Sequence, residues 1–113
     1  MIILYHNKNC SKSRACLELI KNSNTKYKII EYMVAKLNYK DIQNIVYNLQ
    51  DELKDLVRFK DNKLKEKEII NFKNKKIVID LLFKDISKLQ RPIIFYNSKY
   101  IICRPVNKVL KYL

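Results

Sequence analysis

The first third of the chain has the pattern of a β-α-β unit. The apolar run at 2–5 (IILY) is short, as a buried strand is. From Ser11 to about 22–24, apolar residues recur with helical spacing, at Ala15, Cys16, Leu19 and Ile20. A second β-rich run at 27–33 predicts another strand. Because a helical crossover would join the two strands, we expect them to be parallel.

The middle of the chain predicts helices. Asn38 can cap a helix whose first turn is supported by Asp41. The apolar side of this helix is formed by Ile42, Ile45, Val46 and Leu49. A second short helix fits residues 51–58. The run at 76–85 is apolar for nearly its whole length and is compatible with a helix or a strand; we expect a helix.

Residues 59–76 are very polar, but they still predict a helical turn or two around Leu64, Ile69 and Ile70. With the helices on either side, this stretch makes residues 35–90 a helical insertion. The insertion separates the first β-α-β unit from a second group of strands.

The C-terminal residues predict a hairpin followed by a helix. The strand-like runs at 91–96 and 100–105 are separated by residues 97–99, where asparagine tolerates the left-handed backbone of a tight turn. Pro105 can occupy the first turn of a closing helix. The apolar residues of that helix are Val106, Val109, Leu110 and Leu113.

The order β-α-β, helices, β-β-α is typical of an α/β thioredoxin-like fold with a central mixed four-stranded sheet. We therefore expect a single domain over residues 1–113, with its core at 1–34 and 91–113 and the helical insertion between them. The chain length agrees with one domain.

The composition narrows the function. No apolar run approaches the length of a membrane span, and no export signal precedes the three cysteines, so we expect a soluble cytoplasmic protein with reduced thiols. A single histidine and the lack of a CxxC pair predict no metal site.

The net charge of +13 does not indicate a nucleic-acid-binding protein, because the lysines are scattered as AT-rich coding sequence would scatter them. Only four of the 24 basic residues are arginine: Arg14, Arg58, Arg91 and Arg104. The guanidinium group binds oxyanions through two parallel hydrogen bonds, which lysine cannot do, so these four residues are candidates for an anion site.

Cys10 lies between the first predicted strand and the start of the first predicted helix. Free N–H groups at a helix start lower a thiol pKa from about 8.5 to between about 3.5 and 7.5 and also bind anions. The alternative is that Cys10 is a small buried hydrophobe. The polar residues at 6–14 favour the reactive thiolate; those that can assist it are His6, Ser11, Ser13 and Arg14. Cys16 belongs to the apolar stripe and is expected in the core, and we favour a structural role for Cys103.

Four segments together resemble the glutaredoxin-coupled arsenate reductases, the ArsC type of thioredoxin-like protein. They are YHNKNCSKSR (5–14), LVR (56–58), QRPIIFY (90–96) and CRPVNKVLKYL (103–113). The resemblance implies that Cys10 is the nucleophile. It also implies an arsenate-binding set formed by Arg58, Arg91 and Arg104, a thiolate-stabilising set formed by His6, Ser13 and Arg14, and a structural cis-proline, Pro92.

The resemblance further implies a reaction without a bound cofactor. Thiolate Cys10 would attack arsenate, glutathione as co-substrate would attack the adduct, and glutaredoxin would resolve it so that arsenite leaves. We expect a monomer that binds neither membrane nor nucleic acid.

Two other functions remain open from the residues. One is an Spx-like transcriptional regulator that binds RNA polymerase, although Ser13 stands where such proteins have the second cysteine of a CxxC switch. The other is an ArsC-like thiol oxidoreductase with another substrate, because three arginines specify a tetrahedral anion and not arsenic.

Overall fold

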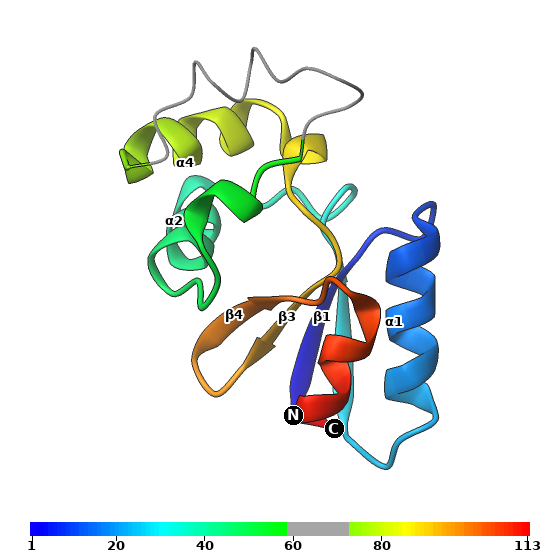
Figure 1. Cartoon of the computed structure of the whole chain (residues 1–113). Coiled ribbons are helices and arrows are strands. Elements are labelled where there is room, and N and C mark those ends of the chain that lie inside the picture. Colours follow the sequence, from blue (N-terminus) through cyan, green and yellow to red (C-terminus); the bar gives the residue numbers. More distant parts are fainter. Residues whose placement is uncertain (59–72) are drawn as a thin grey trace.

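A computed structural model of the protein describes residues 1–58 and 73–113. Its centre is a four-stranded sheet with the strand order β2-β1-β3-β4 (Figure 1). β1 is parallel to β2, whereas β3 is antiparallel to both β1 and β4. The strands are β1 (Ile2–His6), β2 (Tyr27–Glu31), β3 (Ile93–Tyr96) and β4 (Lys99–Ile102). The predicted α/β fold with a mixed four-stranded sheet is confirmed.

Helices cover both faces of the sheet. Helix α1 (Ser11–Lys21) and the 3-10 helix η3 (Val106–Tyr112) lie on one face, and helices α2 (Tyr39–Tyr47) and α4 (Lys75–Lys84) lie on the other side of the molecule (Figure 1). Because side chains alternate along a strand, neighbouring residues of β3 point to opposite faces of the sheet and pack in different hydrophobic cores. Ile93 belongs to the core under α2 and α4, whereas Ile94 packs with Cys16, Ile101 and Val109.

The helix α2 begins at a reciprocal cap. The Asp41 backbone N–H donates to Asn38 Oδ1 at 2.8 Å, and the Asn38 N–H donates back to Asp41 Oδ2 at 2.9 Å. Two N–H groups that the helix cannot pair internally are thus satisfied. Helix α4, with its own asparagine cap at Asn74, confirms a helix over most of the ambiguous run at 76–85.

The predicted helix at 51–58 is wrong in extent, because only the 3-10 turn η1 (Leu53–Asp55) forms. The residues after it pair with a distant segment: Val57 forms an antiparallel bridge with Leu89, and the Arg58 N–H donates to the Lys88 carbonyl at 2.8 Å. Backbone pairing with residues far along the chain therefore overrides the local helical pattern. The helical turns expected around Leu64, Ile69 and Ile70 lie outside the described residues.

The ends of three predicted elements also differ. The strand expected at 27–33 stops at Glu31, whose carbonyl accepts the N–H groups of Val34 and Ala35 in a turn. The strand expected at 100–105 stops at Ile102. The Cys103 N–H still donates to the carbonyl of Pro92, the next residue in the register, at 2.9 Å, but proline has no N–H to return the bond. The closing helix is a 3-10 helix, and Pro105 precedes it as the cap instead of lying in its first turn.

The hairpin between β3 and β4 turns at Asn97 and Ser98, whose φ angles are 48° and 63°. Two-residue hairpin turns need positive φ at both positions, and asparagine tolerates this better than most residues. In the described parts of the chain, no helix is both long and apolar enough to cross a bilayer.

The cap of α2 gives a test of the fold. Replacing Asn38 with alanine removes the acceptor for the Asp41 N–H, so we expect the free energy of unfolding to fall by about 1 kcal/mol. Urea unfolding followed by circular dichroism measures this loss. Asn107→Ala, at an exposed position of η3, is the matched control, and equal stabilities of the two variants would contradict the role of the cap.

Candidate active site

Four segments of the chain meet at one end of the sheet. His6 at the end of β1 lies opposite Glu31 at the end of the parallel strand β2, so the residues that follow each strand are neighbours. Ile93 at the start of β3 lies opposite both Tyr5 of β1 and Ile102 of β4. The loop with Cys10, the residues after β2, the pair 91–92 and the pair 103–104 therefore surround one site.

Cys10 occupies the N-cap position of α1 and is 8% exposed. Its side chain makes no capping hydrogen bond. Its backbone carbonyl accepts the first hydrogen bond of the helix, from the Arg14 N–H at 3.0 Å. Burial raises the pKa of the Cys10 thiol, but the neighbouring Arg91 guanidinium and the backbone N–H groups of Ser13 and Lys12 lower it by more. The net pKa lies below the usual value of cysteine, which favours the thiolate.

A buried polar pair ties the Cys10 loop to α1. Ser13 Oγ lies 2.6 Å from His6 Nδ1 and also accepts the Asn7 N–H at 3.0 Å. His6 is 5% exposed and Ser13 is fully buried. Burial lowers the pKa of His6, the charge of Glu31 raises it and those of Arg14 and Lys21 lower it, with a net decrease that keeps the imidazole neutral at physiological pH. The structure thus brings these two predicted residues together beside Cys10.

Arg14 braces the same loop from outside. It is exposed, and its Nη1 donates to the Lys8 carbonyl at 2.8 Å. The groups with the largest effect on the pKa of Cys10 are Arg91 and the N–H groups of the first turn. Arg14 therefore contacts the backbone of the loop that carries Cys10.

The other three arginines lie close to one another, and Arg58 and Arg91 also interact with Cys10. Arg91 precedes a cis peptide bond to Pro92, and its carbonyl accepts Arg104 Nε at 2.8 Å. Burial lowers the pKa of Arg58, and the charges of Arg91 and Arg104 lower it further, whereas Cys10 raises it. Three cations held this close repel one another, so an anion among them would be stabilising.

Unpaired hydrogen-bonding groups lie in the same site, near Cys10. Among the described residues, three buried side-chain polar atoms have no hydrogen-bond partner: Tyr32 Oη, Arg58 Nη1 and Arg91 Nε. A buried donor without an acceptor costs about 1–3 kcal/mol. Such a cost persists where function requires it, and all three groups can donate to an oxyanion.

Tyr32 was not among the residues that the sequence pattern predicted for the site. Its position directly after a parallel strand was the available signal, since the carboxyl ends of parallel strands meet at one edge. The chain contains eight tyrosines, however, so residue type alone did not single it out.

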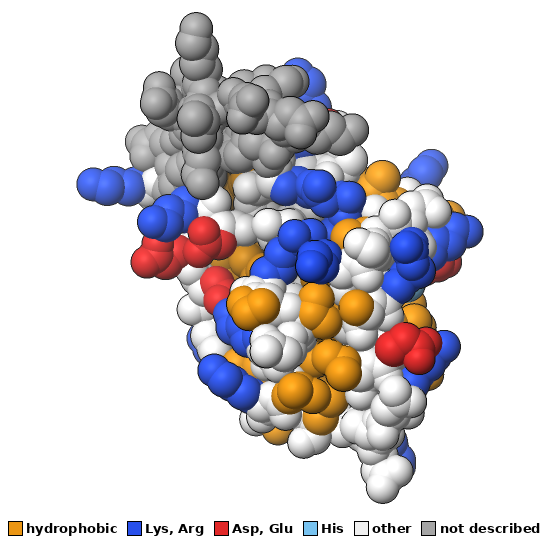
Figure 2. Space-filling view, turned by 45° about the vertical axis from the view of Figure 1, so that its right-hand side comes forward, with side chains coloured by type: hydrophobic (Ala, Val, Ile, Leu, Met, Phe, Trp, Pro, Cys, Tyr) orange, Lys and Arg blue, Asp and Glu red, His pale blue; other side chains and the backbone are white. Residues whose placement is uncertain are grey.

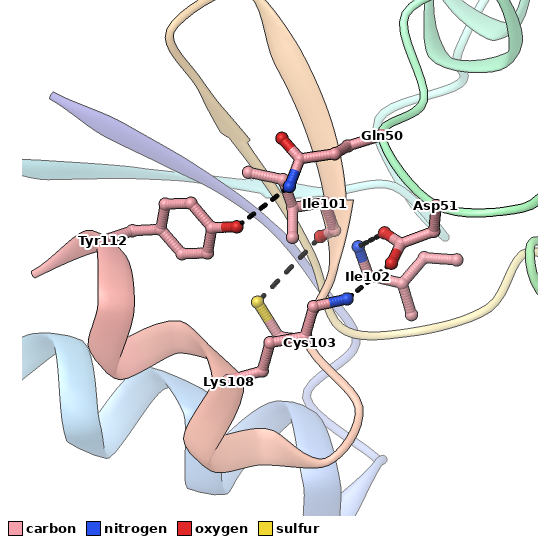
Figure 3. A network of polar contacts seen from close by, with 7 residues as sticks. All are labelled: Gln50, Asp51, Ile101, Ile102, Cys103, Lys108 and Tyr112. Atoms are coloured by element: carbon pink, nitrogen blue, oxygen red, sulfur yellow. Dashed lines mark hydrogen bonds and ion pairs between the residues drawn. The ribbon is translucent and has the colours of Figure 1, made fainter.

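Residues that precede and follow Arg104 in the sequence make polar contacts with residues 50–51 (Figure 3). Before it, the Ile102 N–H donates to Asp51 Oδ2 at 2.8 Å. After it, Lys108 forms an ion pair with the other carboxylate oxygen of Asp51. Gln50 Nε2 also donates to the Tyr112 hydroxyl at 3.2 Å. The end of β4 and the helix η3 are thereby anchored to residues 50–51, and Arg104 lies between the two anchors.

The other two cysteines lie in the core. Cys16 and Cys103 are both fully buried, and they lie together in the core between α1 and the sheet. Hydrogen bonding with Cys16 raises the pKa of Cys103, so Cys103 stays protonated. The core position predicted for Cys16 is confirmed.

One face of the molecule carries a concentration of basic side chains. Figure 2 shows Lys and Arg side chains gathered across the upper middle of the face that brings α1 forward, with Asp and Glu side chains toward its margins. A field of this sign attracts anions. Within residues 1–58 and 73–113, no group of three His, Cys, Asp or Glu side chains is placed to hold a metal ion.

Two curated proteins are similar to this chain over nearly its whole length. An arsenate reductase of Haemophilus influenzae is 33% identical over 117 residues, covering 99% of this chain and 98% of the relative. An arsenate reductase of Neisseria meningitidis serogroup A is 27% identical over 113 residues, covering 96% and 94% of the two chains.

The fold agrees with solved structures as well. The structure described as an arsenate reductase from Vibrio cholerae superimposes with a TM-score of 0.81 at 24% identity, covering 99% of this chain and 97% of that one. The profile of the ArsC family matches residues 5–112. Because that match spans nearly all of the chain, the protein belongs to the ArsC family.

Proposed function

We propose that this protein is an arsenate reductase that uses Cys10 as its nucleophile and glutathione with glutaredoxin as its source of electrons. The observation that carries the proposal is the set of unpaired buried donors from Arg58 and Arg91 beside a cysteine whose pKa is lowered. These donors need an anionic acceptor, and the thiolate needs an electrophile. Arsenate is both, and relatives over the full length bear the name arsenate reductase.

In the first step, the Cys10 thiolate attacks arsenic(V) and forms a sulfur–arsenic bond. One arsenate oxygen takes up protons and leaves as water. Arg58, Arg91 and Arg104 neutralise the oxygens that stay on arsenic, which stabilises the negative charge during the displacement. His6 and Ser13 hold the loop that presents the sulfur.

In the following steps, a glutathione thiol attacks arsenic and a second oxygen leaves as water. A glutaredoxin thiolate then attacks the glutathione sulfur and forms a mixed disulfide, while the electrons of the broken sulfur–arsenic bond reduce arsenic(V) to arsenic(III). Water then displaces arsenite from Cys10. The two electrons come from these external thiols. The burial of Cys16 and Cys103 supports this scheme, because neither can reach an adduct on Cys10 without opening the core. Phosphate and sulfate share the shape and charge of arsenate, but transfer of either to a thiol leads to no useful reduction.

The state of the Cys10 thiol can be measured directly. Since the thiolate is the reactive form, a lowered pKa extends fast alkylation by iodoacetamide to lower pH, and we expect a rate midpoint below about 8.5. Arg91→Met should raise the pH midpoint of alkylation, because it removes the side chain that lowers the pKa of Cys10 most strongly. Arg14→Met should raise it less, because Arg14 contacts the Lys8 carbonyl.

Cys10→Ser is the control for this titration, since the fully buried Cys16 and Cys103 should show no fast alkylation. A midpoint at or above about 8.5 in the unmodified protein would contradict a stabilised thiolate.

The activity itself is tested with the purified protein. We expect arsenite to form from arsenate when glutathione and glutaredoxin are supplied, and Cys10→Ser to abolish turnover while it retains oxyanion binding. Arsenite formation by Cys10→Ser at the rate of the unmodified protein would show that another group is the nucleophile.

Arginine geometry gives a further prediction. Arg91→Lys and Arg104→Lys keep the charge but lose the planar fork, and each should reduce kcat/KM about 10- to 100-fold, the scale of a lost hydrogen bond to a charged group. Lys99→Arg makes the reverse exchange at the far end of β4 and is the matched control. Unchanged kinetics in both arginine variants would assign these residues to the surface and not to the anion site.

A further inference from the structure

Tyr32 lies at the same end of the sheet as Cys10. It directly follows Glu31, the last residue of β2, which is paired in register with His6. The loop after His6 carries Cys10, so the register places this loop beside Tyr32. The Tyr32 side chain is 1% exposed, and its ring belongs to the core under α2 and α4.

The Tyr32 hydroxyl is buried without a hydrogen-bond partner, which does not suit a residue that only fills the core. It makes no hydrogen bond within the described parts of the chain, although the side chains of Asn7 and Arg91 are close by. Buried tyrosine hydroxyl groups usually find a partner, and an unpaired one is destabilising. Phenylalanine would fill the same space without this cost.

Tyr32 is also held in its donor form. Burial raises the pKa of Tyr32, and Arg91 and Asn7 offset only part of this increase. The hydroxyl therefore keeps its proton at physiological pH. A neutral phenol of this kind is a hydrogen-bond donor and a poor general acid.

The two other unpaired buried groups are also donors, Arg58 Nη1 and Arg91 Nε. Arg91 and Cys10 both influence the ionisation of Tyr32, and Tyr32, Arg91 and Cys10 all influence that of Arg58, so the four residues lie close together. A guanidinium group cannot accept a hydrogen bond. The Tyr32 oxygen could accept from a neighbouring donor such as Arg91, but its proton and Arg58 Nη1 would still lack an acceptor. The oxygens of one tetrahedral anion can accept from all three groups.

We propose that Tyr32 is a further substrate-binding residue, whose hydroxyl donates a hydrogen bond to an oxygen of the bound oxyanion and holds that oxygen while Cys10 attacks the central atom. This inference rests on the proposed function. It adds a neutral donor to the three guanidinium groups. No proton is transferred from Tyr32, and the oxygen that it holds stays on arsenic.

Tyr32→Phe tests the proposal, because it removes only the hydroxyl oxygen. Arsenate binding is measured by titration calorimetry in the Cys10→Ser background, where no covalent step occurs, and inorganic phosphate serves as a second probe. We expect Kd for both anions to rise at least about tenfold, as for a lost hydrogen bond to a charged group. Tyr47→Phe, at a residue 61% exposed on α2, is the matched control and should leave Kd unchanged.

Thermal unfolding separates binding from folding. Without an anion, Tyr32→Phe should unfold at the same Tm or a higher one, because an unpaired polar group has been removed from the core. With arsenate, the rise in Tm should be smaller than in the unmodified protein. The pH midpoint of Cys10 alkylation should not move.

The outcomes distinguish the two proposals. If Cys10→Ser binds arsenate and Tyr32→Phe does not weaken it, the role of Tyr32 is overturned and the proposed function stands. If Tyr32→Phe lowers Tm without an anion, its hydroxyl supports the free fold and the inference is likewise overturned. If Cys10→Ser and the unmodified protein bind neither anion, both proposals fail.

Discussion

The site depends on the interaction between the Cys10 sulfur and the Arg91 guanidinium. Burial of the sulfur alone would raise the pKa of Cys10 and leave an inert thiol, and Arg91 is the side chain that opposes this effect most strongly. The two residues come from opposite ends of the chain. They meet because β1 lies between β2 and β3 in the sheet, with Tyr5 opposite Ile93. The pairing of these central strands therefore determines the acidity of the cysteine.

The same interaction explains why the site is electrostatically unbalanced when empty. Arg58 lies within electrostatic reach of Arg91, Arg104 and Cys10. Burial lowers the pKa of Arg58 most, and the repulsion from the other two arginines lowers it further, so positive charge is in excess even if Cys10 is ionised. Three buried polar atoms remain unpaired beside this charge. The free energy that an anion would recover on binding is thus stored in the free protein as unmade hydrogen bonds and unrelieved repulsion, at the expense of stability.

The sequence was most informative where local pattern and tertiary structure agree. The apolar run before Cys10 and the helical stripe after it placed the cysteine at a helix start, and the structure has it as the N-cap of α1. The sequence was least informative where distant backbone pairing decides. Residues 56–58 have a helical pattern, yet they pair with residues 88–90 and so carry Arg58 toward the site. Tyr32 shows the same limit, because its importance arises from an absent partner, which no sequence pattern records.

The geometry of α1 decides how an adduct on Cys10 can be resolved. Cys16 lies six residues further along the helix, and a rise of about 1.5 Å per residue separates the two Cα atoms by roughly 9 Å. A disulfide requires less than about 7 Å, so Cys16 cannot attack at Cys10 while the helix is intact. Cys103 is fully buried, packed with Cys16 and kept protonated by a raised pKa. These are the only other thiols in the chain. In the proposed mechanism, a covalent intermediate on Cys10 would therefore persist until a thiol arrives from solution.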